Sequence, residues 1–170
     1  MRDPGAVLPA ILFACVLAIG GGTAGGQDEK SGSLDACLAR NGFDEAAAKK
    51  FGADKNGMKK YVIAFLRRGP NRPTDPEKAK ELQAAHMKNI NRMAAEGKLV
   101  LAGPFMEDGD LRGIYIFNAA TLAEAEALTN TDPAVKAGSL VMELKEWYGS
   151  AALMAVNAIH ERLTSPEQAR

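Results

Sequence analysis

The sequence predicts an α+β domain with the element order strand–helix–strand–strand–helix–strand between Met58 and Trp147. Three observations lead to this prediction: apolar runs of strand length, capping-box motifs that mark helix starts, and turn residues at the joins. Two strand–helix–strand halves of this kind build a four-stranded antiparallel sheet with its helices on one face.

The first half of the domain contains the strongest helix signal. Its strand is the apolar run Lys60–Arg67, and its helix is expected to begin at a capping box formed by Thr74 and Glu77. The helix should run to about Glu96 and end at Gly97. It presents one stripe for burial, whose members step by three or four residues: Ala79, Leu82, His86, Ile90 and Met93.

The second half of the domain has shorter elements joined by tight turns. Asp132 precedes Pro133 and is expected to cap a short helical turn that closes at Gly138. In chain order, we expect a strand at Lys98–Ala102, a hairpin at Glu107–Asp110, a strand at Leu111–Asn118, a helix from the capping box Thr121–Glu124 to about Asn130, and a last strand at Ser139–Trp147.

The N-terminal residues have the layout of a secretory signal peptide. Arg2 supplies the positive charge, Ala6–Ile19 is the apolar stretch, and the small residues that follow place cleavage after about Ala24. A membrane span needs roughly 20 residues, so an uncleaved anchor is the weaker alternative, and a lipid anchor on Cys15 is another. We therefore expect a periplasmic or secreted protein without a membrane partner after cleavage.

The chain is expected to divide into a signal peptide at 1–26, a linker and short helical N-terminal extension at 27–57, the α+β domain at 58–148, and a C-terminal helix and tail at 149–170. The strands are apolar on both sides, so the sheet face away from the helices also needs a cover. A twofold partner is the economical cover, and the N- or C-terminal helix is the alternative.

Composition argues against several classes of function. The 21 basic and 21 acidic residues balance without a long run of one sign, which argues against nucleic acid as a partner. The histidines and cysteines form no ligand cluster and no phosphate-binding glycine pattern is present, so we expect no metal and no cofactor. RNA-binding domains share this element order, but the strand at 111–118 offers only Tyr115 and Phe117 for base stacking. Cleavage would leave Cys37 alone, without an intramolecular disulfide.

Several short segments together resemble the YciI-like (YCII-related) family: His86, Gly97–Phe105, Gly113–Phe117, Glu124-Ala125, Asp132-Pro133, Gly138 and Glu146-Trp147. The resemblance implies a ferredoxin-like fold that pairs into a dimeric α+β barrel, and therefore a homodimer. It also implies that a histidine and an aspartate, here His86 and Asp132, meet in a pocket. The family is similar to the muconolactone-isomerase-like group, which carries out acid–base chemistry on small aromatic or lactone-like molecules. The export signal and the flanking helices depart from the usual family pattern and could mean a different partner or substrate.

His86 breaks the pattern of its helix, because leucine would fill an inward position at no polar cost. A buried imidazole without a hydrogen-bond partner costs roughly 1–3 kcal/mol. Asp132 is the candidate partner, because it would fix the tautomer and leave the second ring nitrogen free to move a proton. On this hypothesis His86 is a general base and Asp132 its orienter in an enzyme that acts on a small organic substrate. The alternative is a structural histidine in a non-catalytic ligand-binding or dimerisation module.

Phe105 and Arg112 are the expected pocket-lining residues, and each has a plainer alternative. Phe105 could equally belong to the core, and Arg112 could be a solvated surface residue instead of a contact for an anionic substrate. The basic loop that contains Arg67, Arg68 and Arg72 could attract a carboxylate, with a solvated face as the default reading.

Overall fold

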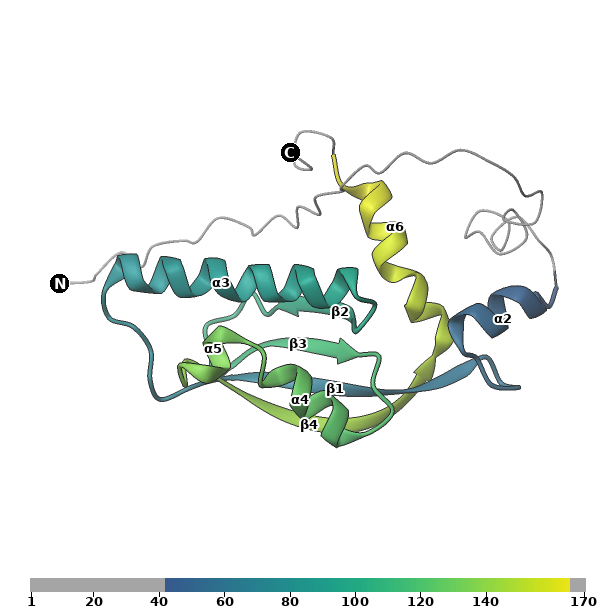
Figure 1. Cartoon of the computed structure of the whole chain (residues 1–170), viewed down its shortest axis with the longest axis horizontal. Coiled ribbons are helices and arrows are strands. Elements are labelled where there is room, and N and C mark those ends of the chain that lie inside the picture. Colours follow the sequence, from purple (N-terminus) through teal and green to yellow (C-terminus); the bar gives the residue numbers. More distant parts are fainter. Residues whose placement is uncertain (1–41, 166–170) are drawn as a thin grey trace.

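A computed structural model of the chain describes residues 42–165, drawn in colour in Figure 1. The expected signal peptide, Cys37 and the first part of the N-terminal extension lie outside this range. Within it, no helix has both the length and the apolar character needed to cross a membrane.

The domain is built on a four-stranded antiparallel sheet with the strand order β2-β3-β1-β4. Its element order is that of the ferredoxin-like βαββαβ fold, so the predicted fold class is confirmed. The two central positions of the order are held by β3 and β1, and β2 and β4 form the edges. The strands are β1 (Met58–Arg68), β2 (Leu99–Pro104), β3 (Leu111–Phe117) and β4 (Leu140–Ser150).

Three helices lie on one side of this sheet, with the long helix α3 running over it in Figure 1. Asp75 caps α3, because its carboxylate accepts a hydrogen bond from the N–H of Glu77 at 2.9 Å. The prediction that Thr74 would be the cap was therefore wrong by one residue, since the carboxylate directly before Pro76 reaches these donors. The helices are α3 (Pro76–Ala95), α4 (Leu122–Thr129) and α5 (Pro133–Lys136).

The second predicted cap, Thr121, is confirmed at the start of α4, and the returning bond from Glu124 goes to Ala120, one residue before the cap. The Thr121 hydroxyl accepts from the N–H of Glu124 at 3.2 Å, and the Glu124 carboxylate accepts from the N–H of Ala120 at 2.8 Å. The first bond satisfies a donor that the first turn of the helix leaves open, and the second ties Glu124 to the residue before the cap, so together they fix the start of α4 close to the end of β3.

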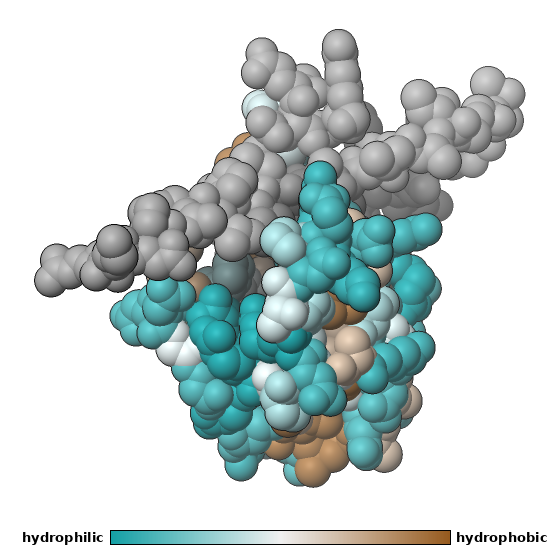
Figure 2. Space-filling view, turned by 90° about the vertical axis from the view of Figure 1, so that its left-hand side faces the viewer, coloured by the Kyte–Doolittle hydropathy of each residue, from teal (hydrophilic) through white to brown (hydrophobic). Residues whose placement is uncertain are grey.

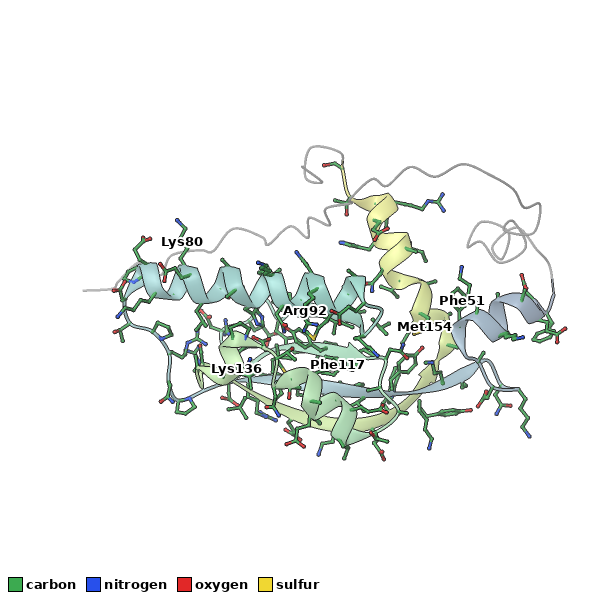
Figure 3. All side chains as sticks on the ribbon, in the orientation of Figure 1. Phe51, Lys80, Arg92, Phe117, Lys136 and Met154 are labelled. Carbon is green, nitrogen blue, oxygen red and sulfur yellow. The ribbon has the colours of Figure 1, made fainter. Side chains whose placement is uncertain are left out.

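The flanking segments form short helices at one end of the sheet. The N-terminal helix α2 (Glu45–Phe51) lies in the predicted helical extension, is capped by Asp44, and ends at Gly52, whose φ is 69°. The C-terminal helix expected within 149–170 is instead two elements, a 3₁₀ helix, η2 (Ala151–Ala155), followed by α6 (Val156–Leu163). Phe51 of α2 and Met154 of η2 lie near each other in Figure 3, where these two elements pack together.

The main core lies between the helices and the sheet. Alternate residues of β1 face it, and Phe117 of β3, labelled in Figure 3, is fully buried there. The helix side contributes Ile90 and Met93 from the predicted stripe of α3. The buried members are Val62, Ala64, Leu66, Ile90, Met93, Leu99, Tyr115, Phe117, Ala119 and Ala125.

The opposite face of the sheet is only partly covered. Leu153 and Met154 of η2 pack against a second cluster formed by Tyr61, Val100 and Ile116, so the C-terminal segment covers one end of this face. Towards the other end, the side chain of Val141 on β4 remains 48% exposed. The alternative of a C-terminal cover is thus right for part of the face.

Candidate active site

His86 lies near the middle of α3 and points at the sheet. The helix presents it there because it belongs to the stripe that also buries Ile90 and Met93, four and seven residues later. Only 8% of His86 is exposed to solvent. The helix therefore holds an imidazole within the main core, where each ring nitrogen needs a partner.

Asp132 reaches His86 from the neighbouring helix α5, of which it is the N-cap. Its carboxylate accepts a hydrogen bond from the N–H of Ala134 at 2.8 Å through Oδ1, and Pro133 occupies the first position of the helix. Asp132 has no exposed surface. The cap predicted from the sequence is confirmed, and the backbone N–H of Ala134 holds the carboxylate in place.

The two residues form a direct pair in the core. Nδ1 of His86 lies 2.9 Å from Oδ1 and 2.8 Å from Oδ2 of Asp132. A carboxylate only accepts hydrogen bonds, so Nδ1 carries the proton, and in the neutral imidazole Nε2 is left as an acceptor. The pair connects residues that are far apart in the sequence, which the predicted topology brings together.

The sequence analysis expected the second ring nitrogen of His86 to be free, but this nitrogen faces a tyrosine hydroxyl. The oxygen of Tyr115 lies 3.2 Å from Nε2, in hydrogen-bond range, and the two rings stack at a centroid distance of 6.2 Å. With Nδ1 protonated, the Tyr115 hydroxyl donates to Nε2. The three side chains form one hydrogen-bonded line, Asp132–His86–Tyr115.

Tyr115 is held in place by its strand. It is 2% exposed, and its ring meets Phe117 edge to face at 5.7 Å between centroids. Burial raises the pKa of its hydroxyl, and the negative charge of Asp132 raises it further. The phenol is therefore kept neutral and able to donate.

The sequence contained a signal for Tyr115 that our prediction did not use. Tyr115 and Phe117 alternate on β3 and share the face towards the helices, and a buried tyrosine hydroxyl needs a polar partner. The only inward polar residue predicted on the first long helix was His86. Combining these two facts would have joined the hydroxyl to the imidazole.

A second polar cluster ties α3 to the turn that carries Asp132. Thr131 donates to Oδ1 of Asn89 at 3.1 Å, and Arg92 donates to the same oxygen at 2.9 Å and to the Thr131 hydroxyl at 3.0 Å. Arg92 points from α3 towards the layer of α4 and α5 in Figure 3. The cluster fixes the separation between the helix of His86 and the residue just before Asp132.

The expected pocket-lining residues lie near the hairpin between β2 and β3. Phe105 follows β2, is 42% exposed, and its N–H donates to the carbonyl of Arg112 at 2.9 Å. Arg112 donates to the carbonyl of Gly109 at 3.2 Å and lies 3.7 Å from the carboxylate of Asp108. Neither residue makes a recorded contact with the His86 pair, and their pocket-lining role stays a prediction.

Two hollows on the described surface lie elsewhere. One, of about 180 Å³, lies at the β1 and β4 strands beside Tyr61 and Trp147, and the other at the start of α2. Within residues 42–165, no group of three or more histidine, cysteine, aspartate or glutamate side chains is placed to hold a metal ion.

Comparison with known proteins gives the family of the chain. The model of the YCII-related domain matches residues 62–148, just over half of the chain. The protein YjpA of Bacillus subtilis, described as uncharacterised, is 36% identical over 64 residues, which are 38% of this chain and 73% of YjpA. A solved structure of 5-chloro-2-hydroxyhydroquinone dehydrochlorinase (TftG) from Burkholderia phenoliruptrix, in complex with 2,5-dihydroxybenzoquinone, covers 52% of this chain and 93% of its own, at 24% identity and a TM-score of 0.39. That likeness is too distant to bring an activity to this chain. The family match and YjpA suffice for one conclusion: the chain belongs to the YCII-related domain family.

Proposed function

We propose that this protein is an acid–base enzyme that moves a proton on a small organic substrate. His86 carries the proton, Asp132 orients and stabilises it, and Tyr115 passes the proton between His86 and the substrate. The observation that carries the proposal is the unbroken line of hydrogen bonds from Asp132 through His86 to Tyr115.

The energetic cost of this line supports a functional role. A fully buried carboxylate is strongly unfavourable unless it is paired, and breaking such a pair costs about 3–5 kcal/mol. Aliphatic and aromatic side chains of similar size would fill the same space without that risk. Departures from the simplest core packing concentrate at functional sites, because catalysis needs groups whose protonation the environment controls.

The geometry supports a relay with balanced protons. As the substrate gives its proton to the Tyr115 oxygen, the hydroxyl proton of Tyr115 passes to Nε2 of His86. Tyr115 stays neutral throughout, in keeping with its raised pKa, and the positive charge develops on His86 beside the Asp132 carboxylate. Reversing the transfer onto another atom of the substrate would isomerise it. Positioned groups of this kind contribute about 10²–10⁴-fold to a rate.

The alternative is a non-catalytic module that binds a small ligand or a second copy and keeps His86 for structure. Two observations favour it: both ring nitrogens already have partners within the protein, and His86 lines neither of the two hollows described above. A satisfied, nearly buried histidine of this kind needs no substrate to explain it.

Deuterium exchange distinguishes the enzyme from the non-catalytic module. The purified protein is incubated in D₂O with a panel of small aromatic and lactone compounds that have acidic C–H groups, and NMR follows the loss of each C–H signal. The enzyme proposal expects catalysed exchange that His86→Gln reduces at least about 100-fold, with His160→Gln, which replaces the other histidine, unchanged. Exchange that survives His86→Gln would refute it, as would a panel without any catalysed exchange.

We further propose that the protein is a homodimer. The family resemblance implies this arrangement, and the half-exposed Val141 lies on the part of the sheet that η2 leaves open. Light scattering after gel filtration is expected to give twice the chain mass for the wild type and the chain mass for Val141→Glu. A monomeric wild type would contradict the proposal. Export to the periplasm or medium is likewise our proposal, drawn from the N-terminal sequence.

A further inference from the structure

Three arginines from separate segments gather where β1 ends and α3 begins. Arg68 is the last residue of β1, Arg72 lies in the loop before α3, and Arg112 is near the start of β3. The N–H of Arg68 donates to the carbonyl of Asp110 at 2.7 Å, which brings the end of β1 beside the start of β3. In keeping with this, desolvation and then the charges of Arg68 and Arg112 lower the pKa of Arg72. Like charges held together in this way repel unless an anion lies among them.

The neighbouring acidic residues do not neutralise this cluster. Arg67 takes two of them, because its guanidinium lies 3.0 Å from Asp110 and 3.0 Å from Glu143. Within the described residues, Arg68 and Arg72 have no recorded ion pair, and Arg112 has only the longer contact of 3.7 Å to the fully exposed Asp108. The cluster therefore keeps excess positive charge.

The loop that carries Arg72 is fixed by backbone contacts. The N–H of Gly69 donates to the carbonyl of Ser139 at 2.9 Å, and the N–H of Asn71 donates to the carbonyl of Gly138 at 3.0 Å. The approach is so close that a Cβ on Gly69 would lie 2.1 Å from the Gly138 carbonyl oxygen. An anchored loop presents its arginine with less entropy to lose when a ligand binds.

The same contacts connect this loop to the candidate active site. Ser139 donates its N–H to the carbonyl of Ala134 in α5, the helix that Asp132 caps. On the sheet, Arg68 pairs with Leu140, which packs against the main core, so Arg68 lies on the helix side as well. Arg68 and the His86 pair thus share one side of the sheet.

The separation suits a small molecule. Ala64, the register partner of Tyr115, is four residues from Arg68, which is roughly 13 Å along a strand. The long arginine side chains can cover part of that distance. Figure 2 views the molecule from this end, where mostly hydrophilic residues frame a strip of apolar surface.

We infer that Arg68, Arg72 and Arg112 bind the carboxylate of a small organic acid whose apolar body reaches towards Tyr115 and His86. The guanidinium fork matches a carboxylate with two parallel hydrogen bonds. This rests on the proposed function for the role of His86, and it adds the class of substrate: a carboxylated aromatic or unsaturated acid in place of a neutral lactone.

Benzoate, benzamide and inorganic phosphate, titrated separately into the purified protein and followed by NMR, test the inference. We expect benzoate to bind, and Arg72→Gln and Arg68→Gln each to weaken it about tenfold or more. Lys80→Gln is the matched control, because it removes one positive charge from a residue that points away from the sheet in Figure 3, and it should leave binding unchanged. Benzamide, which has the same ring without the charge, should bind at least tenfold more weakly.

The results also separate this inference from the proposed function. Benzoate binding without any catalysed deuterium exchange would leave the anion site standing and refute the enzyme. Catalysed exchange with equal rates for acids and their amides, unaffected by Arg72→Gln, would refute the anion site alone. Benzoate binding that is absent, that ignores both arginine variants, or that is weaker than phosphate binding would also overturn the inference.

Discussion

Replacing Tyr115 by phenylalanine tests the relay at its most specific point. The substitution removes one oxygen and keeps the ring that packs edge to face on Phe117. If Tyr115 passes the proton, deuterium exchange should fall by about 10²–10⁴-fold. If His86 instead meets the substrate directly through Nε2, removing the hydroxyl frees that nitrogen, and exchange should stay the same or rise.

The effect on stability should be small by comparison. A neutral hydrogen bond contributes about 0.5–1.5 kcal/mol, and leaving the buried Nε2 without a partner brings the loss to about 1–3 kcal/mol. Because His86 keeps 8% of its surface exposed, water can partly replace the hydroxyl, so we expect a loss near 1 kcal/mol in urea unfolding. The domain should stay folded under assay conditions.

Tyr61→Phe is the matched control for this experiment. Tyr61 is 1% exposed and its hydroxyl donates to the carbonyl of Ser150 at 3.0 Å, far from His86. Both variants lose one hydroxyl from a buried tyrosine, so their stabilities should fall by similar amounts, and only Tyr115→Phe should slow exchange. Equal exchange rates in the two variants would refute the relay.

The structure makes two further predictions, and the N-terminal sequence makes a third. The raised pKa of Tyr115 keeps its hydroxyl neutral in the folded state, while the unfolded residue ionises near pH 10. Its contribution to the free energy of unfolding is therefore complete below about pH 10 and is lost as the pH rises above that. Urea titrations from pH 9 to 11 should show a smaller loss of stability in Tyr115→Phe than in the wild type. His86→Leu should lower the free energy of unfolding by about 3–5 kcal/mol, because it leaves the buried Asp132 carboxylate without its partner. The double variant His86→Leu with Asp132→Asn should recover part of that loss. Additive losses in unfolding experiments would show that the two residues are not coupled. Intact-mass analysis of protein made in an exporting host should show cleavage after about residue 24. The denatured mature protein should then contain one thiol, that of Cys37, and retention of the full N-terminus would contradict the signal peptide.

Local signals predicted most of the fold. Capping residues act on the N–H groups next to them, so Thr121 and Asp132 could be assigned from neighbouring positions alone. The Thr74 prediction failed for the same local reason, because Asp75 is the stronger acceptor and sits directly before Pro76. The split of the C-terminal helix into η2 and α6 depends on how Leu153 and Met154 pack on the sheet, which no local pattern describes.

The pairing of His86 with Asp132 could be predicted from the sequence, but the contact between the second ring nitrogen and Tyr115 could not. Inward position on a helix and a capping aspartate indicated two buried polar groups, and the family resemblance joined them. That the second nitrogen faces Tyr115 depends on where β3 lies beneath α3. The free nitrogen assumed for a general base is occupied, and this turns a two-residue hypothesis into a relay with a specific test.

The arginines show most clearly what a sequence cannot decide. Arg67 and Arg68 are adjacent and chemically identical, yet successive residues of a strand face opposite sides of the sheet. The register of β1 with β4 puts Arg67 opposite Val141, on the side where Glu143 and Asp110 neutralise it, and Arg68 opposite Leu140, on the side of the core. A shift of one residue in that register would exchange their roles, leaving Arg68 in the ion pairs and Arg67 beside Arg72. An Arg67→Gln variant should therefore lose stability through its ion pairs and bind benzoate normally, and Arg68→Gln should do the reverse.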